Sequence, residues 1–409
     1  MKTSVRTLLI CVLVSGPLAG CGGGGGGGGG GTGGGSGDPP AGQEFYDSPV
    51  SVSETLQFTT IDAGYNHTCA IATSGDTYCW GFNGQRQLGS SAPMGSCADG
   101  NYDCSETPVL VDGGHSFTQI AAAKFHTCAL DTSGDAYCWG SGLGGQLGDG
   151  LRASSREPVA VAGGLKFTTI AASAQSGAVC GLTSVGDAWC WGVNTSGSLG
   201  NGTEYEGGSV PGPVATSLKF VSLSINHNNA CAVSTARDAL CWGDNWFGQL
   251  GVGSRSSEGG MAESFVPVAV LGGIKFDQIS ASATHSCALQ SGGDVYCWGA
   301  EDRLGIEGAI NESLPTLVVN PGSSPWVALD IGFGQTCVMT ADGKLDCWGQ
   351  LTSRFPPEEA ETPFRIEGSR AYVEISTGGT HQCAIGTDAL AYCWGMNNWA
   401  QVGQPPSDP

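Results

Sequence analysis

Seven copies of one cysteine motif constrain the fold of this chain more than any other feature. Each copy has the form Cys, nine residues, Cys-Trp-Gly, and the first cysteines run from Cys69 to Cys383. Their mean spacing is about 52 residues, a period typical of repeat arrays. The pairs are Cys69 and Cys79, Cys128 and Cys138, Cys180 and Cys190, Cys231 and Cys241, Cys287 and Cys297, Cys337 and Cys347, and Cys383 and Cys393.

The residues between the two cysteines of a pair predict a β-hairpin. Their centre is turn-like, as in Thr73-Ser74-Gly75-Asp76, and flanks such as Thr77-Tyr78-Cys79 have the character of short strands. In this register the two cysteines face each other across antiparallel strands, within disulfide range. We therefore expect seven disulfides inside hairpins. Zinc is the alternative, but zinc-binding cysteines normally stand much closer together in sequence.

Two more strand signals precede each hairpin. A segment such as residues 58–64 alternates like a strand, and before it comes Pro with an apolar neighbour, as in Pro108-Val109, which suits an edge strand. Four short strands in each of seven repeats predict an all-β protein, a seven-bladed β-propeller, over residues 44–404, followed by a tail at 405–409. Pro49-Val50 stands ahead of the first hairpin, so we expect residues 44–54 to complete the last blade and close the ring.

The segment Trp242–Gly251, with the sequence WGDNWFGQLG, resembles the regulator of chromosome condensation repeat. The resemblance covers about residues 44–404, although the fifth repeat is shortened and the sixth has lost the motif after Trp348. It implies a propeller that acts mainly as a protein-binding platform. The cysteine pairs are similar to those of exported bacterial members and of some plant receptor ectodomains, so nuclear exchange-factor activity is not implied.

The N-terminal residues predict export and a lipid anchor. Lys2 and Arg6 precede an apolar run over 8–14 that is too short to span a bilayer, as in a signal peptide over residues 1–20. The sequence Leu-Ala-Gly-Cys ending at Cys21 resembles the lipobox at which bacterial lipoproteins are acylated; an ordinary signal peptide is the alternative. Residues 21–43, mostly glycine, then form a flexible tether. We expect a lipoprotein of the outer membrane or cell surface rather than of the inner membrane.

Charge excludes some partners. The chain has 37 acidic and 16 basic residues and a formal charge of −21, which opposes binding to the phosphates of nucleic acids. The membrane is then contacted only through the lipid, and a basic or neutral protein partner is favoured. The sequence contains no nucleophile elbow and no His-Glu-x-x-His motif, so we expect no enzymatic activity and no cofactor; a propeller enzyme with active-site acids at the mouth of the ring is the alternative.

Two groups of residues could bind a metal. His67, His126, His285 and His381 each stand two residues before a first cysteine, where we expect packing between blades; a metal site or proton switch is the alternative. An eighth cysteine pair, Cys97 and Cys104, brackets Asp99, Asn101 and Asp103. We expect a stapled surface loop, with calcium binding by its side-chain oxygens as the alternative. With Cys11 removed and Cys21 acylated, no cysteine is left free.

The loops after each Trp-Gly differ most between repeats and carry aromatic residues. Aromatic residues and arginine on loops over a rigid scaffold suit a protein interface. Packing of each residue on its own blade and stacking on a carbohydrate are the alternatives. The candidate partner-binding residues are Phe82, Tyr102, Tyr205, Trp246, Phe247, Phe265, Arg303, Phe355 and Trp399.

Overall fold

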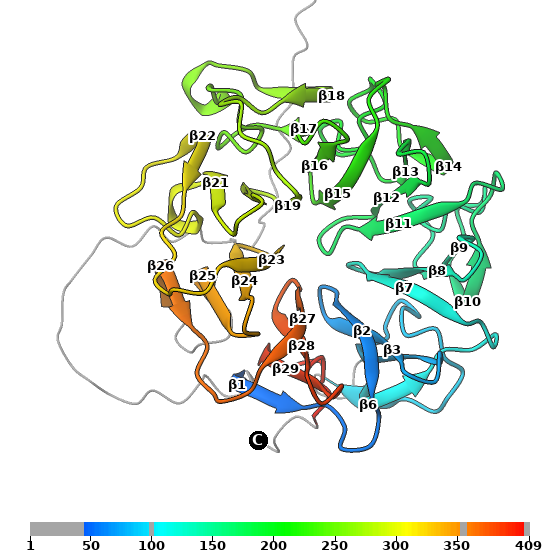
Figure 1. The fold of residues 1–409 in the computed structure, drawn as a ribbon. Helices are drawn as coiled ribbons and strands as arrows, with labels where there is room; N and C mark the ends of the chain where they lie inside the picture. Colours follow the sequence, from blue (N-terminus) through cyan, green and yellow to red (C-terminus); the bar gives the residue numbers. More distant parts are fainter. Residues whose placement is uncertain (1–44, 98–101, 352–357, 405–409) are drawn as a thin grey trace, which may run out of the picture. The chain divides into compact units, whose positions relative to one another are not determined.

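The computed structural model describes residues 45–97, 102–351 and 358–404, which lie in one compact unit, Asp38–Pro409. The described residues form seven antiparallel sheets arranged as the blades of a β-propeller (Figure 1). Two single-turn 3-10 helices, Ser256–Glu258 and Glu301–Arg303, lie in loops. Within these ranges no helix is long and apolar enough to cross a membrane. The seven-bladed all-β fold expected from the sequence is confirmed.

The blades follow one another along the chain. From the innermost to the outermost strand they are, for blade 1, β2 (Phe58–Ala63), β3 (His67–Ala72), β4 (Thr77–Phe82), β6 (Tyr102–Leu110) and β5 (Gly95–Cys97); for blade 2, β7 (Phe117–Ala122), β8 (His126–Asp131), β9 (Ala136–Gly140) and β10 (Ser155–Ala160); for blade 3, β11 (Phe167–Ala172), β12 (Ala178–Thr183), β13 (Ala188–Gly192) and β14 (Gly208–Pro213); for blade 4, β15 (Phe220–Asn226), β16 (Asn229–Ser234), β17 (Ala239–Asp244) and β18 (Glu263–Ala269). Blade 5 has β19 (Gln278–Ala281), β20 (His285–Leu289), β21 (Val295–Gly299) and β22 (Glu312–Leu317); blade 6 has β23 (Trp326–Ile331), β24 (Gln335–Thr340), β25 (Leu345–Leu351) and β26 (Glu358–Arg365); blade 7 has β27 (Tyr372–Thr377), β28 (His381–Gly386), β29 (Ala391–Met396) and β1 (Phe45–Ser51).

Blade 7 closes the ring with strands from both ends of the described chain. β1 pairs with β29 in antiparallel register, with Val50 opposite Cys393 (Figure 1). The expectation that the segment around Pro49-Val50 completes the last blade is therefore confirmed. Closure gives every blade a neighbour on both faces, so no apolar blade face is left open, and each sheet keeps only its short outermost strand as an edge.

Every predicted disulfide within the hairpins is present. In all seven blades the paired cysteines are opposed residues on the second and third strands, with Cα atoms 4.0–4.2 Å apart. An eighth bridge joins Cys97 to Cys104 in the insertion of blade 1, also as the sequence led us to expect. In chain order, the seven hairpin bridges join Cys69 to Cys79, Cys128 to Cys138, Cys180 to Cys190, Cys231 to Cys241, Cys287 to Cys297, Cys337 to Cys347 and Cys383 to Cys393.

The turns of these hairpins require an unusual backbone conformation. Most of them place glycine in the left-handed region, such as Gly75 at φ 90°. Arg237 and Ala389 hold the same position at φ 66° and 63°, a conformation that side chains disfavour. The hairpin geometry is thus kept in blades 4 and 7 even where glycine is absent from the turn.

The apolar core lies between blades rather than within them. Seven core clusters each combine residues of two successive blades. Phe117 and Trp139 of blade 2, for example, pack with Ile71 and the Cys69–Cys79 bridge of blade 1. Each repeat therefore needs a neighbour to bury its apolar face, as in other repeat proteins.

Candidate functional site

The variable loops after each Trp-Gly all lie at one end of the ring. In an antiparallel blade the connections after the first and third strands leave the same edge of the sheet. Accordingly, the backbone N–H of Phe82, where the blade 1 loop starts, donates to the carbonyl oxygen of Asn66 in the turn between β2 and β3. We call this end, formed by the loops after the third strands and by the inner turns after the first strands, the loop face. The disulfide hairpins form the opposite end.

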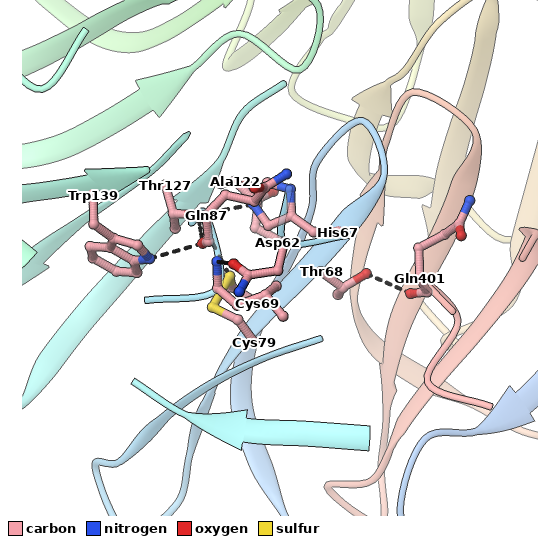
Figure 2. The surroundings of a disulfide bond; sticks show 12 residues. Asp62, His67, Thr68, Cys69, Cys79, Gln87, Ala122, Thr127, Trp139 and Gln401 are labelled. Carbon is pink, nitrogen blue, oxygen red and sulfur yellow. Dashed lines mark hydrogen bonds between the residues drawn. A yellow bond between two sulfur atoms is a disulfide. The ribbon is translucent and has the colours of Figure 1, made fainter. Parts of the chain in front are cut away.

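Several residues of the repeat motif on this face have structural roles. The Asn83 side chain accepts a hydrogen bond from the N–H of Leu88, and Asn245 does the same for Leu250. The indole N–H of Trp139 donates to the carbonyl oxygen of Gln87 in the preceding blade. Figure 2 shows that this carbonyl oxygen also accepts a hydrogen bond from the Thr127 hydroxyl, beside the Cys69–Cys79 bridge. Such residues shape the loops and join the blades, so they leave recognition to their variable neighbours.

All four ring histidines are buried between neighbouring blades, as the sequence led us to expect. Three of them bond the next blade, whereas neither ring nitrogen of His126 has a partner among the described residues. The Nε2 atom of His67 lies 2.9 Å from the Thr127 hydroxyl oxygen, and that of His381 lies 2.6 Å from the Thr68 hydroxyl oxygen. His285 pairs with Thr336 in the same way. Burial lowers the pKa of all four histidines, including His126, to about 3. They stay neutral at physiological pH, which disfavours a proton switch.

The Cys97–Cys104 bridge closes the insertion of blade 1 and packs against the loop of blade 7. Both cysteines are buried and pack against Ala400, with Trp399 beside them. Of the candidate calcium ligands, Asp99 and Asn101 lie outside the described residues, and the side chain of Asp103 is exposed. The described residues contain no group of three or more metal-ligating side chains. Calcium binding by this loop stays a prediction.

Three of the candidate aromatic residues come together beside this bridge. Phe82, Tyr102 and Trp399 have ring centroids 4.9–5.8 Å apart and tilted or edge-on ring planes. Phe82 is only 8% exposed, so it supports the other two from below, whereas Tyr102 is 50% exposed. The cluster joins loops of blades 1 and 7, which are far apart in sequence.

Most of the remaining candidates lie around blades 3 and 4. Tyr205 is 70% exposed and Trp246 is 54% exposed, while Phe247 and Phe265 are half-buried. The N–H of Gly202, in the loop that carries Tyr205, donates to the carbonyl oxygen of Phe265.

Two candidates remain. Arg303 contacts Asp302, Thr284 and Gln350, so its guanidinium is engaged in joining blades 5 and 6. Phe355 lies outside the described residues.

The sequence did not predict the polar central cavity. The innermost strands of all seven blades line a space of about 430 Å³. Burial raises the pKa of Asp62 to about 8 and that of Asp330 to about 7, and it also raises the pKa of Glu374. Aligning the inner strands could have revealed these acids, because Asp62 and Asp330 both stand four residues after the aromatic residue that starts each repeat.

The acids of the cavity bond the backbone of neighbouring blades. Asp62 accepts from the N–H of Ala122 at 2.6 Å and from the hydroxyl of Ser376 at 2.9 Å. Asp330 accepts from the N–H of Thr377. Their oxygens are therefore occupied in holding the ring together.

Comparison with known proteins identifies the repeats. The family model described as Regulator of chromosome condensation (RCC1) repeat matches residues 74–130, 133–180 and 238–289, and a second model of the same description matches 58–87, 117–146 and 276–303. The ultraviolet-B receptor UVR8 of Arabidopsis thaliana is 26% identical over 230 residues, which are 53% of this chain and 50% of that protein. The chain thus spans about half the length of this relative.

Solved structures share the fold at low identity. Human WBSCR16 matches with a TM-score of 0.70 and 17% identity, covering 85% of this chain and 88% of that one. Yeast RCC1 (Prp20) bound to Kap60 matches with a TM-score of 0.67 and 20% identity, covering 83% and 80%. The seven repeated cysteine motifs, the seven blades and the matches to the repeat models all indicate the same repeat architecture. The chain therefore contains regulator of chromosome condensation repeats at several places along its length.

Proposed function

We propose that this protein is an exported lipoprotein, anchored through Cys21, whose propeller binds another protein of the cell envelope through its loop face. One observation carries the binding role. Tyr102 at the start of β6, and Tyr205 and Trp246 on loops, are each at least half exposed on the loop face, on the rigid scaffold of blades 1, 3 and 4. Exposed large aromatic side chains on a rigid surface are the residues that most often anchor protein interfaces.

The proposed role is binding rather than catalysis. The ring histidines are buried and neutral between blades, and the acids of the cavity accept hydrogen bonds from backbone N–H groups. Among relatives of this fold, yeast RCC1 has been solved in complex with Kap60, a protein partner. That complex supports a protein-binding use of the fold and says nothing about which protein this chain binds.

The test of binding is capture from an envelope extract, with chemical crosslinking to residues 38–409 in oxidised form. We expect a protein that crosslinks to the wild type to be lost when Tyr205→Ala and Trp246→Ala are combined. Val185→Ala is the matched control, because Val185 is 64% exposed in a hairpin turn at the opposite end of the ring. A captured protein that both variants retain equally would refute the loop face as the interface.

Retention on immobilised envelope glycans gives the competing outcome. If the Tyr205→Ala/Trp246→Ala variant loses glycan retention while protein capture stays intact, the face binds carbohydrate, and the protein-binding proposal fails. If glycan retention is absent from the wild type, that alternative is removed.

The anchor needs a separate test. We expect metabolic labelling with a radioactive fatty acid to mark the wild-type chain, and Cys21→Ser to abolish both the label and recovery in the membrane fraction. A Cys21→Ser chain that stays membrane-bound and labelled would contradict lipidation at this residue.

A further inference from the structure

The inner turn of blade 3 differs from the other six. The interval from Phe167 to Cys180 is two residues longer than the corresponding interval in every other blade, such as Phe58 to Cys69. The Ser173 hydroxyl oxygen accepts hydrogen bonds from the N–H groups of the two residues after Ala174 and so shapes the longer turn. Ala174 also lines the central cavity, so the turn stands at the cavity mouth on the loop face.

A lysine without a carboxylate partner flanks this turn on the blade 2 side. The Nζ atom of Lys124 lies 5.3 Å from the ring centroids of both Tyr65 and Phe125, and the N–H of Lys124 donates to the carbonyl oxygen of Ser173. In the described ranges no carboxylate lies within ion-pair distance of its ammonium. By contrast, the lysines Lys166, Lys219 and Lys275 at the hairpin end each pair with an aspartate.

The blade 4 side of the turn carries a histidine. His227 is exposed in the inner turn between β15 and β16. Partial burial of its ring and the positive charge of Lys124 lower the pKa of His227, so the imidazole is mostly neutral at pH 7 and offers a hydrogen-bond donor rather than a charge. The carboxylate of Asp244 also acts on His227, but it already accepts hydrogen bonds from the side-chain amides of Asn228 and Gln249.

The turn itself offers an unused donor. Gln175 is only 5% exposed, and its Nε2 atom has no hydrogen-bond partner within the described residues. A buried amide without a partner costs free energy that a ligand acceptor would recover. Lys124, Gln175 and His227, which we call the blade 3 notch, therefore combine one ammonium with an imidazole and an unsatisfied amide donor in a chain whose formal charge is −21.

We propose that the blade 3 notch receives a carboxylate from an exposed acidic segment of the protein partner. This inference rests on the proposed function and names the chemistry at one point of the loop face. A region of locally positive charge on an acidic protein attracts the opposite sign and fixes the register of docking. Phe125, 38% exposed beside the lysine, gives the apolar contact that a protein segment, unlike a free ion, would use. The notch thus favours an acidic contact, where net charge alone favours a basic or neutral partner.

The experiment follows the histidine and amide resonances of residues 38–409 by NMR. The probe is a blocked tetraglutamate peptide at millimolar concentration, and its tetraglutamine counterpart is the uncharged control. We expect tetraglutamate alone to shift the resonances of His227 and Gln175. Lys124→Met should weaken binding about fivefold, the effect of losing one exposed ion pair. Lys166→Met, which removes the same charge at the hairpin end, should leave the affinity unchanged.

Each other outcome refutes the proposal. Equal shifts with both peptides, no shift at the notch, or equal weakening by Lys124→Met and Lys166→Met would exclude a carboxylate site there. Competition by sulfate at equal concentration would show a simple anion site without protein recognition. A circular-dichroism melt of Lys124→Met checks folding. If the envelope partner is captured equally by wild type and Lys124→Met, the platform stands and the notch fails, so the two proposals are separable.

Discussion

The junction that closes the ring, between blades 7 and 1, and the junction between blades 3 and 4 both bury an apolar cluster, but they differ in their side-chain hydrogen bonds. At the closing junction the Thr68 hydroxyl lies 2.6 Å from His381 Nε2 and donates to the carbonyl oxygen of Gln401, while the Ser376 hydroxyl accepts from the N–H of Ala63. At the other junction Ala178 and Ala230 stand in place of the histidine and threonine, and Ala171 stands in place of the serine. An apolar cluster that includes Leu223, Ile225 and Trp242 fills that junction.

The difference shows where directional bonds are needed. Blades 3 and 4 are joined by a short connection that already fixes which strands meet, so non-directional apolar burial is sufficient there. Blades 7 and 1 meet only when segments more than 300 residues apart find each other, as the Thr68–His381 pair does. Buried polar pairs penalise a misplaced register because each leaves a donor or acceptor unsatisfied.

Removal of the central indole of the apolar junction should have the largest effect. Trp242 is fully buried, and its N–H donates to the carbonyl oxygen of Ser198. We expect Trp242→Ala to lower the free energy of unfolding by about 3–5 kcal/mol, measured by urea denaturation. Trp246→Ala in the same blade is the matched control and should cost less than about 0.5 kcal/mol. Similar losses for both variants would contradict the apolar junction.

Replacing one hydroxyl by a methyl group at the closing junction should cost less free energy of unfolding than Trp242→Ala. Thr68→Val leaves His381 and the carbonyl oxygen of Gln401 buried without this partner, so we expect a loss of about 1–3 kcal/mol in the free energy of unfolding. Thr132→Val, in an exposed hairpin turn, is the control and should be nearly neutral. Hydrogen exchange should report faster opening in β1 and β2 than in β15. Unchanged exchange there would argue against a polar closure.

The polar junctions should also respond to pH. Burial raises the pKa of Asp62 to about 8 and that of Asp330 to about 7 in the folded state. The folded chain therefore binds these protons more tightly than the unfolded chain, and the stability they contribute below about pH 4 is lost as pH rises through 7 to 8. Each group changes the free energy of unfolding by at most about 1.4 kcal/mol per pH unit.

The Asp62→Asn/Asp330→Asn double variant tests this sign. We expect it to flatten the fall in stability between pH 5 and pH 8, measured by urea denaturation at each pH. Leu223→Val at the apolar junction should instead lower stability by a similar amount throughout. A double variant with the wild-type slope would show that other groups set the pH dependence.

The smallest effect should come from supplying a missing bond. At the junction of blades 2 and 3, Val179 stands where Thr68 stands at the closing junction, and both ring nitrogens of His126 lack a partner among the described residues. We expect Val179→Thr to raise the free energy of unfolding by about 0.5–1.5 kcal/mol. The gain should vanish in a His126→Ala background. An equal effect in both backgrounds would exclude a new histidine–threonine bond.

The fold was predictable because the cysteine spacing that specifies each hairpin is constant along the sequence. The spacing of Cys69 and Cys79 recurs in every blade, and opposed residues in a hairpin follow from it directly. The position of Pro49-Val50 also predicted the closing strand. These features reflect local geometry, which a repeated sequence specifies seven times.

The candidate site was less predictable because side chains at equivalent positions differ between blades. Phe82 lies where a variable loop begins, but Tyr102 and Trp399 cover it. The contact with Trp399 forms only because closure of the ring brings blades 1 and 7 together. Lys124 gave no signal as an isolated lysine. Its position between Tyr65 and Phe125, beside the longer turn of blade 3, depends on contacts between successive blades.

The disulfide pattern has a consequence for how the cysteines find their partners. Sixteen cysteines could pair in a vast number of ways, but each of the eight bridges joins a cysteine to the next one along the described chain, seven or ten residues away. An oxidant that acts on the chain from its N-terminal end meets every correct pair in order. Oxidation can therefore proceed blade by blade, without the reshuffling that crossed connectivities require.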